Sequence, residues 1–146
     1  MSEENRALVR RAWAAYDAGD VEAFAACVAP DWREYGTPDP SDGFYTLDDE
    51  RRTMESHKIA FPDKHTELHH IVAEGEYVAC SCTVRATHTG PYMGLAPTGK
   101  RVEMYEMMIN RIRDGRISES WAISTGEGFF EQLTGEQAPE QLDNMG

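Results

Sequence analysis

Glu106 is the side chain of this sequence whose surroundings point most directly to acid–base chemistry. It lies in the stretch EMYEMMINRIRDGRISESWAIST, residues 103–125, where methionines flank it on both sides. A carboxylate buried among apolar side chains loses solvation, which raises its pKa and suits it to proton transfer near neutral pH. The residue pattern alone is equally compatible with a Glu106 that faces water.

The pairing of two expected strands on either side of Asp114-Gly115 decides which side chains accompany Glu106. A two-residue turn would place Glu106 opposite Ile123, whereas a three-residue loop over 113–115 would place it opposite Ala122. A slip of one residue exchanges the two faces of a strand. We favour the three-residue loop because it makes one face uniformly apolar, with Tyr105, Met107, Ile109, Ile117, Trp121 and Ile123.

The second face in this register has the shape of a pocket wall. Its small side chains leave space above the sheet, and Glu106 and Met108 project into that space. The members of this face are Glu106, Met108, Asn110, Ser118, Ser120, Ala122 and Ser124.

Three helices are expected in the first part of the chain. Apolar residues at helical spacing place them within 4–20, 20–30 and 47–63. Asp20 is the expected N-cap of the second helix, and Thr46 with Asp49 resembles a capping box at the start of the third. The expected terminators are Gly19, Pro30 and Pro62.

The remainder of the chain alternates apolar and polar residues as strands do. A short strand is expected near 32–35, and four longer ones within 66–75, 76–90, 100–115 and 116–125. Helices followed by antiparallel strands indicate an α+β domain, a curved sheet with helices on one face. We expect one domain over 1–146, with a frayed tail from about residue 136.

Composition and charge favour a small-molecule partner. The 146 residues carry a formal net charge of −12, which repels nucleic-acid phosphates and anionic lipid. The sequence has no apolar run long enough to span a membrane, and its acidic start is unlike a signal peptide. We therefore expect a cytoplasmic protein that binds neither nucleic acid nor membrane, with Cys27, Cys80 and Cys82 as buried thiols.

Several segments resemble the SnoaL-like polyketide cyclases, small members of the α+β cone fold of nuclear-transport-factor-like and ketosteroid-isomerase-like proteins. The likeness spans nearly the whole chain. It is carried by YDAGD (16–20), APDW (29–32), AFPD (60–63), IVAEGEYVA (71–79), THTGPYMGLAPTGKRVE (87–103), RIRDGRISESW (111–121) and FFEQLTG (129–135).

This resemblance implies a fold and an arrangement of its faces. The expected fold is α+β, with a curved antiparallel or mixed sheet that forms a cone and three N-terminal helices that cover an apolar pocket. The face that carries Glu106 would line the pocket. The opposite face, with Met107, Trp121 and Ile123, would bury against a second subunit in a homodimer.

The resemblance also shows what this chain lacks. Family cyclases typically have an aspartate directly after the position of Trp121 and a histidine at the position of Met108, whereas this chain has Ala122 and Met108. Glu106, on the neighbouring strand, is then a candidate for a relocated base. The alternative is that Glu106 only shapes the cavity and that Asn110 or a tyrosine satisfies its hydrogen bonds.

Two further residues are candidate catalytic groups. Tyr35 follows APDWRE, where family members often carry a pocket-facing histidine or asparagine, and its phenol could donate a hydrogen bond to a reacting oxygen. His88 opens the family-like HTG and could shuttle protons or order the following loop. Tyr35 could equally be an ordinary core tyrosine.

The remaining candidates concern ligand and metal binding. His57 is either a pocket residue or a half-exposed helix residue, and Met108 and Ala122 stand where the family acid–base pair would be. The expected apolar walls are Trp13, Tyr16, Tyr45, Tyr92 and Met93. Because His69 and His70 should point to opposite faces of a strand, we expect no metal site, and no nucleotide fingerprint suggests a cofactor.

These observations lead to two hypotheses for function. The first is a cofactor-independent cyclase or isomerase of secondary metabolism that acts on a polyketide-like or aromatic substrate. Because the usual aldol pair is absent, ring closure by intramolecular epoxide opening is a concrete candidate reaction, with Glu106, Tyr35 and His88 as the acid–base groups. The second is a non-catalytic binding or carrier protein of the same fold.

Overall fold

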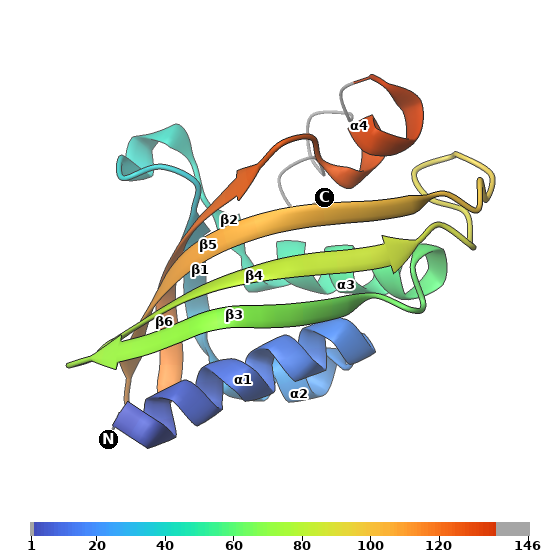
Figure 1. Cartoon of the computed structure of the whole chain (residues 1–146). Coiled ribbons are helices and arrows are strands. Elements are labelled where there is room, and N and C mark those ends of the chain that lie inside the picture. The colour runs from blue at the N-terminus through green and yellow to red at the C-terminus, as the bar shows by residue number, and fades with distance from the viewer. Residues whose placement is uncertain (1, 137–146) are drawn as a thin grey trace.

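A strongly curved, unclosed sheet forms the frame of the molecule in the computed structural model, which describes residues 2–136. Its strand order is β2-β1-β6-β5-β4-β3, and neighbouring strands are antiparallel except for the parallel pair β1–β6. The strands are β1 (Val28–Tyr35), β2 (Tyr45–Thr46), β3 (His65–Glu74), β4 (Tyr77–Thr87), β5 (Arg101–Arg113) and β6 (Arg116–Thr125). Figure 1 shows α3 behind the long strands and α1 along β3.

The described part of the chain contains four α-helices. They are α1 (Ser2–Ala18), α2 (Val21–Cys27), α3 (Leu47–Ala60) and α4 (Phe129–Thr134), with a 3-10 turn η1 (Pro40–Asp42). Asp20 caps α2 by accepting a hydrogen bond from the Ala23 amide at 3.0 Å. The capping box of Thr46 and Asp49 at the start of α3 is present with both of its hydrogen bonds. These caps confirm the predicted starts of α2 and α3.

The second helix ends earlier than its sequence pattern suggests. It stops at Cys27, and Val28 already pairs with Ile117 of β6. Pro30, expected to terminate the helix, lies within β1 instead. The pairing of β1 with β6 is irregular between Val28 and Arg33, and an irregular stretch can accommodate a proline, which has no N–H to donate.

The turn between β5 and β6 differs from the predicted three-residue loop. Arg113 pairs with Arg116, so that the turn contains only Asp114 and Gly115. Both have positive φ, 51° and 73°, as the favoured tight hairpin turn requires. The predicted loop is therefore wrong at this position.

A bulge in β6 shifts the pairing after the turn. Ile112 lies opposite Ile117, but Arg111 lies opposite Glu119, which leaves Ser118 as the extra residue. Further along, Glu106 lies opposite Ser124 rather than the predicted Ala122.

The observed partner of Glu106 is displaced by two residues from the predicted one, so the faces stay the same. Glu106, Ser120 and Ala122 thus share one face as expected, because side chains alternate along a strand with a period of two. Ile117 is the exception, since the bulge turns it into the core, where 4% of it is exposed.

Two clusters of buried side chains fill the space between the concave face of the sheet and the helices. The first joins α1, α2 and Met54 of α3 to the inner residues of the strands. The second joins Phe61 and Tyr92 to Phe129 and Leu133 of α4, a helix that was not predicted from the sequence. The cysteines Cys27, Cys80 and Cys82 are buried and unpaired, as expected. No helix in the part of the chain that the structure describes has the length and apolar character to cross a bilayer.

Gly90 packs directly against the end of α3. The amides of Thr89 and Gly90 both donate to the carbonyl oxygen of Ala60, at 3.0 and 3.2 Å. A Cβ atom at position 90 would lie 2.0 Å from the carbonyl oxygen of Ile59, a distance that forces the backbone apart.

We expect Gly90→Ala to lower the free energy of unfolding by about 3 kcal/mol or more, because a backbone oxygen cannot yield as a side chain can. Urea unfolding of the variant measures this loss. Gly36→Ala is the matched control, since a Cβ at position 36 meets nothing within 4 Å. Equal stability of the two variants would contradict the close approach.

Candidate functional site

An inner cavity lies between the concave face of the sheet and the first three helices, with about 430 Å³ of empty volume, open solvent included. Its wall is mostly apolar and aromatic, from Val9, Ala12, Trp13, Tyr16, Phe24, Val28, Trp32, Met108 and Ile117. Five polar side chains interrupt this wall: Glu34, Glu50, Glu106, Asn110 and Ser120. An apolar cavity with a few placed polar groups is the usual form of a small-molecule site.

A second, more polar hollow of about 1410 Å³, open solvent included, adjoins the inner cavity. Tyr45, Met104, Ala122 and Ser124 are among its lining residues. Glu34 and Glu106 line both spaces. These two carboxyl groups therefore stand at the boundary between the outer hollow and the inner cavity.

Three carboxyl groups are buried around the inner cavity. The exposed fractions of Glu34, Glu50 and Glu106 are 6%, 2% and 4%. Glu34 extends from β1 opposite Ser120 of β6, Glu50 from the first turns of α3, and Glu106 from β5. Carboxylates are seldom buried so fully without a cationic partner, so this cluster is chemically distinctive.

Burial changes the acidity of all three groups. It raises the pKa of Glu106 to about 7, against a weaker opposing effect of the Ser124 hydroxyl, whose Oγ lies 3.4 Å from Oε2. Burial raises the pKa of Glu50 to about 8, an effect that Lys64 offsets in part and that repulsion from Glu106 increases. Burial, followed by repulsion from Glu106 and Glu50, raises the pKa of Glu34 well above its usual value. The cavity thus holds protonated and ionised carboxyls together near neutral pH.

Two oxygens of this cluster have no hydrogen-bond partner among the described residues. They are Oε1 of Glu50 and Oε1 of Glu106. Buried polar atoms are nearly always paired in folded proteins, so unpaired ones at a cavity wall are available to a ligand. The site can therefore accept or donate a proton at a bound molecule.

Lys64 is a buried cation whose charge acts on Glu50. Its Nζ donates toward Nδ1 of His57 at 3.2 Å and lies 3.5 Å from the ring centroid of Tyr16. Burial lowers the pKa of Lys64 to about 8, and the charges of Glu50 and Asp17 oppose this effect. Lys64 is therefore a buried cation that can act as the counter-charge of Glu50.

The structure distributes the predicted wall residues over several places. Trp13, Tyr16 and Met108 line the inner cavity, and Tyr45 and Ala122 line the outer hollow. His57, which could have been half-exposed, is 2% exposed. Its ring packs against Phe61, Tyr92 and Phe129, and Met93 adjoins the same cluster. His57, Tyr92 and Met93 line neither of the two spaces.

Tyr35 does not face the cavity as expected. Its ring stacks on Trp121, with centroids 6.0 Å apart, on the outer face of the sheet. Successive side chains of a strand point to opposite faces, so Glu34 takes the inward position. Glu34, which the sequence analysis did not name, is the residue of this strand that lines both spaces.

His88 lies away from both spaces, in the second core cluster beside Phe61. The backbone amide of Thr98 donates to its Nδ1 at 3.1 Å, and the Thr98 hydroxyl lies 2.9 Å from the same atom. These contacts order the loop after β4, which was the structural alternative for this residue. We therefore assign it no role in the cavity.

The histidines of β3 are not placed as expected. The pairing with β4 is irregular between Leu68 and His70, and both His69 and His70 reach hydroxyl groups on the outer face. His69 Nε2 lies 2.7 Å from Thr83 Oγ1, and His70 Nδ1 lies 2.8 Å from Ser81 Oγ. Their expected placement on opposite faces was therefore wrong. Among residues 2–136, no group of three or more His, Cys, Asp or Glu side chains is placed to hold a metal ion.

Glu34 and Glu50 are site residues that the sequence reasoning missed. A signal for Glu50 was present, because it shares one helical stripe with the buried residues Met54 and His57. Glu34 lies two residues after Trp32, and the alternation of a strand places both on the same face. A charged residue in register with a buried tryptophan was the available clue.

Comparison with known proteins identifies related sequences and folds. The model of the family described as SnoaL-like polyketide cyclase matches residues 6–133. AclR from Streptomyces galilaeus, a proposed hydroxylase, is 30% identical with a TM-score of 0.80, over 97% of this chain and 87% of that one. IdmH from Streptomyces antibioticus, a proposed polyketide cyclase, is 30% identical with a TM-score of 0.68, over 82% and 91%.

A more distant structure shows the same fold. A proposed SnoaL-like polyketide cyclase from Jannaschia sp. CCS1 is 17% identical with a TM-score of 0.72, over 96% of each chain. A search of curated proteins found no match.

Proposed function

Because the chain belongs to the SnoaL-like polyketide cyclase family, we propose that its cavity catalyses cyclisation or isomerisation of a polyketide-like or aromatic molecule of secondary metabolism. The family and fold support a cofactor-free cyclase or isomerase in general. The observation that carries the proposal is the cluster of three buried carboxyl groups around one apolar cavity. Such groups supply both a base and an acid to a substrate shielded from water.

We assign the base to Glu106 and the acid to Glu34. With a pKa of about 7, Glu106 is partly ionised at neutral pH and its Oε1 has no partner among the described residues. Glu34 has a pKa well above its usual value, because of burial first and neighbouring carboxylates second, which favours its protonated form. Both groups border the same two spaces.

Intramolecular epoxide opening is the proposed reaction for this pair. Glu106 removes the proton of a substrate hydroxyl as that oxygen forms a bond to an epoxide carbon. The carbon–oxygen bond of the epoxide breaks, and Glu34 protonates the released oxygen. Substrate and product have the same composition, and transfer of the proton from Glu106 back to Glu34 resets the site.

The second candidate is a binding or carrier protein without turnover. The observation that favours it is the apolar character of positions 108 and 122, which are Met108 and Ala122 in the cavity walls. These are the positions where family cyclases typically carry a histidine and an aspartate.

Incubation with a panel of aromatic hydroxy-epoxides and diketones separates the two candidates. We expect a cyclase to convert at least one member to an isomer of unchanged mass, or to a dehydrated ring product, with many turnovers and no added cofactor. Chromatography with mass spectrometry detects both products. A protein that binds members of the panel and returns every one unchanged is a carrier.

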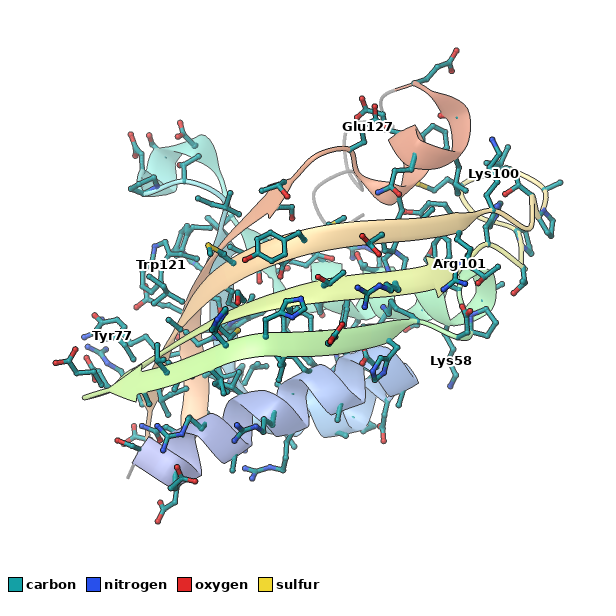
Figure 2. All side chains as sticks on the ribbon, viewed as in Figure 1. Lys58, Tyr77, Lys100, Arg101, Trp121 and Glu127 are labelled. Carbon is teal, nitrogen blue, oxygen red and sulfur yellow. The ribbon has the colours of Figure 1, made fainter. Side chains whose placement is uncertain are left out.

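We also propose that the protein is a homodimer that pairs through the outer face of the sheet. Large apolar side chains are exposed there, among them Val72, Met107, Ile109 and Ile123. Trp121, labelled in Figure 2, belongs to the same face as Ile109, its partner across β5 and β6. An exposed apolar patch of this kind is typical of a protein interface.

Ile109→Glu is expected to convert the dimer into a monomer, because a charge in an apolar interface loses its solvation. Light scattering after size-exclusion chromatography measures the mass. Ile59→Glu, on α3 and also exposed to solvent, is the control that should leave the dimer intact. A native mass of one chain would refute the interface.

Within this proposal the protein works in the cytoplasm. Its cysteines are unpaired, and burial raises the pKa of Cys80 to about 11, so that this thiol stays protonated and unreactive. Free buried thiols are typical of proteins in a reducing compartment.

A further inference from the structure

A hydrogen-bonded chain fixes the orientation of Asn110 at the wall of the inner cavity. The indole Nε1–H of Trp32 donates to Ser120 Oγ at 3.0 Å. The Ser120 hydroxyl in turn donates to Asn110 Oδ1 at 2.8 Å. An indole nitrogen can only donate, so the direction of the chain is determined from its first member.

The reverse orientation of the amide is less favourable. It would direct the NH2 group of Asn110 at Ser120 Oγ, which already accepts a hydrogen bond from Trp32. The Ser120 hydroxyl would then lose Asn110 Oδ1 as its acceptor. The observed orientation satisfies Ser120 fully and holds Asn110 Oδ1 away from the cavity.

This orientation leaves the amide nitrogen of Asn110, Nδ2, without a hydrogen-bond acceptor in the described part of the chain. Asn110 is 2% exposed, and its Nδ2 has no hydrogen-bond partner among the described residues, although the side chain lines the cavity. A buried donor without a partner is destabilising, because it has lost its hydrogen bonds to water. A ligand that supplies an acceptor recovers this loss, and one that does not leaves it in place.

We propose that Asn110 Nδ2 is the anchor for a carbonyl oxygen of the ligand, such as that of a ketone or quinone. The nitrogen can only donate, which excludes ammonium and other groups without a lone pair at this point. The carboxyl groups of Glu34, Glu50 and Glu106 share the cavity, which disfavours a negatively charged acceptor. A neutral carbonyl meets both conditions.

The position of the anchor also bears on which group of the ligand it contacts. Asn110 and Glu106 lie on the same face of β5, four residues apart. At about 3.3 Å per strand residue, their backbones are separated by roughly 13 Å. The anchored carbonyl is therefore a different group of the ligand from the one that Glu106 deprotonates.

This inference rests on the proposed use of the cavity as a ligand site, but not on turnover. If the substrate panel shows no conversion and Asn110 still selects carbonyl compounds, the protein is a carrier and the inference stands. If conversion occurs without carbonyl selection, the inference fails and the proposed function stands.

The test compares a bicyclic ketone, α-tetralone, with tetralin, the hydrocarbon of the same ring system. Quenching of tryptophan fluorescence reports binding, because Trp13 and Trp32 line the cavity. We expect the ratio of ketone affinity to hydrocarbon affinity to fall about 10-fold in Asn110→Leu, the loss of one hydrogen bond to a buried donor.

Ser120→Ala tests the positioning role of the chain, and we expect it to lower the same ratio by a smaller factor. Ser118→Ala is its matched control, because the Ser118 hydroxyl bonds the backbone oxygen of Arg111 instead. A ratio that is unchanged in both Asn110→Leu and Ser120→Ala overturns the proposal.

An infrared measurement on the native protein needs no variant. A carbonyl that accepts a hydrogen bond from Asn110 absorbs at lower frequency than α-tetralone dissolved in a hydrocarbon. We expect this downward shift in the bound ketone. A bound carbonyl with the frequency found in hydrocarbon solution overturns the proposal whether or not the variants fold.

Discussion

Glu106→Gln is expected to slow base catalysis in the cavity by about 10²-fold or more while ligand affinity stays close to that of the native protein. Glutamine has the shape of glutamate but cannot accept a proton, so the cavity wall is preserved and the base is removed. Ring opening of 5-nitrobenzisoxazole, which requires only a base and gives a yellow phenolate, measures this loss without knowledge of the native substrate. The native rate should rise with pH through about 7, the pKa of Glu106.

Two comparisons make this result specific. Glu103→Gln, on the same strand but in an exposed ion pair with Arg85, should leave the rate unchanged. Glu50→Gln shows whether the neighbouring acid is the base instead. A Glu106→Gln variant with native activity beside an inactive Glu50→Gln variant would transfer the assignment to Glu50.

The free energy of unfolding is expected to fall as the pH rises from about 4.5 to about 8. The unfolded glutamates have pKa values near 4.5, whereas burial raises those of Glu106 and Glu50 to about 7 and about 8 in the folded protein. Between these values the unfolded chain releases protons that the folded chain retains, so rising pH favours unfolding. The stabilisation is complete below pH 4.5 and is lost as the pH passes each folded pKa.

The expected size of this effect is on the order of 3 kcal/mol for Glu106 alone, at 1.36 kcal/mol per pKa unit. Lys64 acts in the opposite sense at higher pH. Because burial lowers its pKa to about 8 from an ordinary 10.5, its contribution makes stability rise again between these two values. Between pH 5 and 8 the protein should therefore be least stable near pH 8.

Urea unfolding at pH 5, 6, 7 and 8 measures this dependence. Glu50→Gln should flatten the slope between pH 5 and 8, because glutamine does not titrate. Glu55→Gln, on the same helix but exposed, should keep the native slope. A native protein as stable at pH 8 as at pH 5 would mean that the buried carboxyls retain ordinary acidity.

The sequence predicted the face of Glu106 although it gave the wrong partner. The two-residue turn at Asp114-Gly115 and the extra residue at Ser118 together displace the pairing by two positions, and a strand has a period of two. The bulge depends on how β5 and β6 pack against the core, which turns Ile117 inward. Local turn preferences do not contain that information.

Glu34 and Glu50 were not predicted as site residues, each for a different reason. Tyr35 carried the resemblance to a known site position, but the alternation of side chains along β1 directs Glu34, not Tyr35, toward the cavity. Polar residues are assigned to the surface by default, so a buried Glu50 on an otherwise amphipathic helix is easily taken for a solvated one. The helices and long strands were predictable because their apolar periodicity is strong.

The position of Glu34 and Glu106 at the boundary between the outer hollow and the inner cavity affects which ligands can enter the cavity. Under the proposed function, a ligand that moves from the outer hollow into the inner cavity passes these two acids, and ionisation of Glu106 above about pH 7 makes this boundary negative. We therefore expect anions to enter less readily than the uncharged forms of the same weak acids. Such a boundary would select for neutral ligands before they contact the apolar wall.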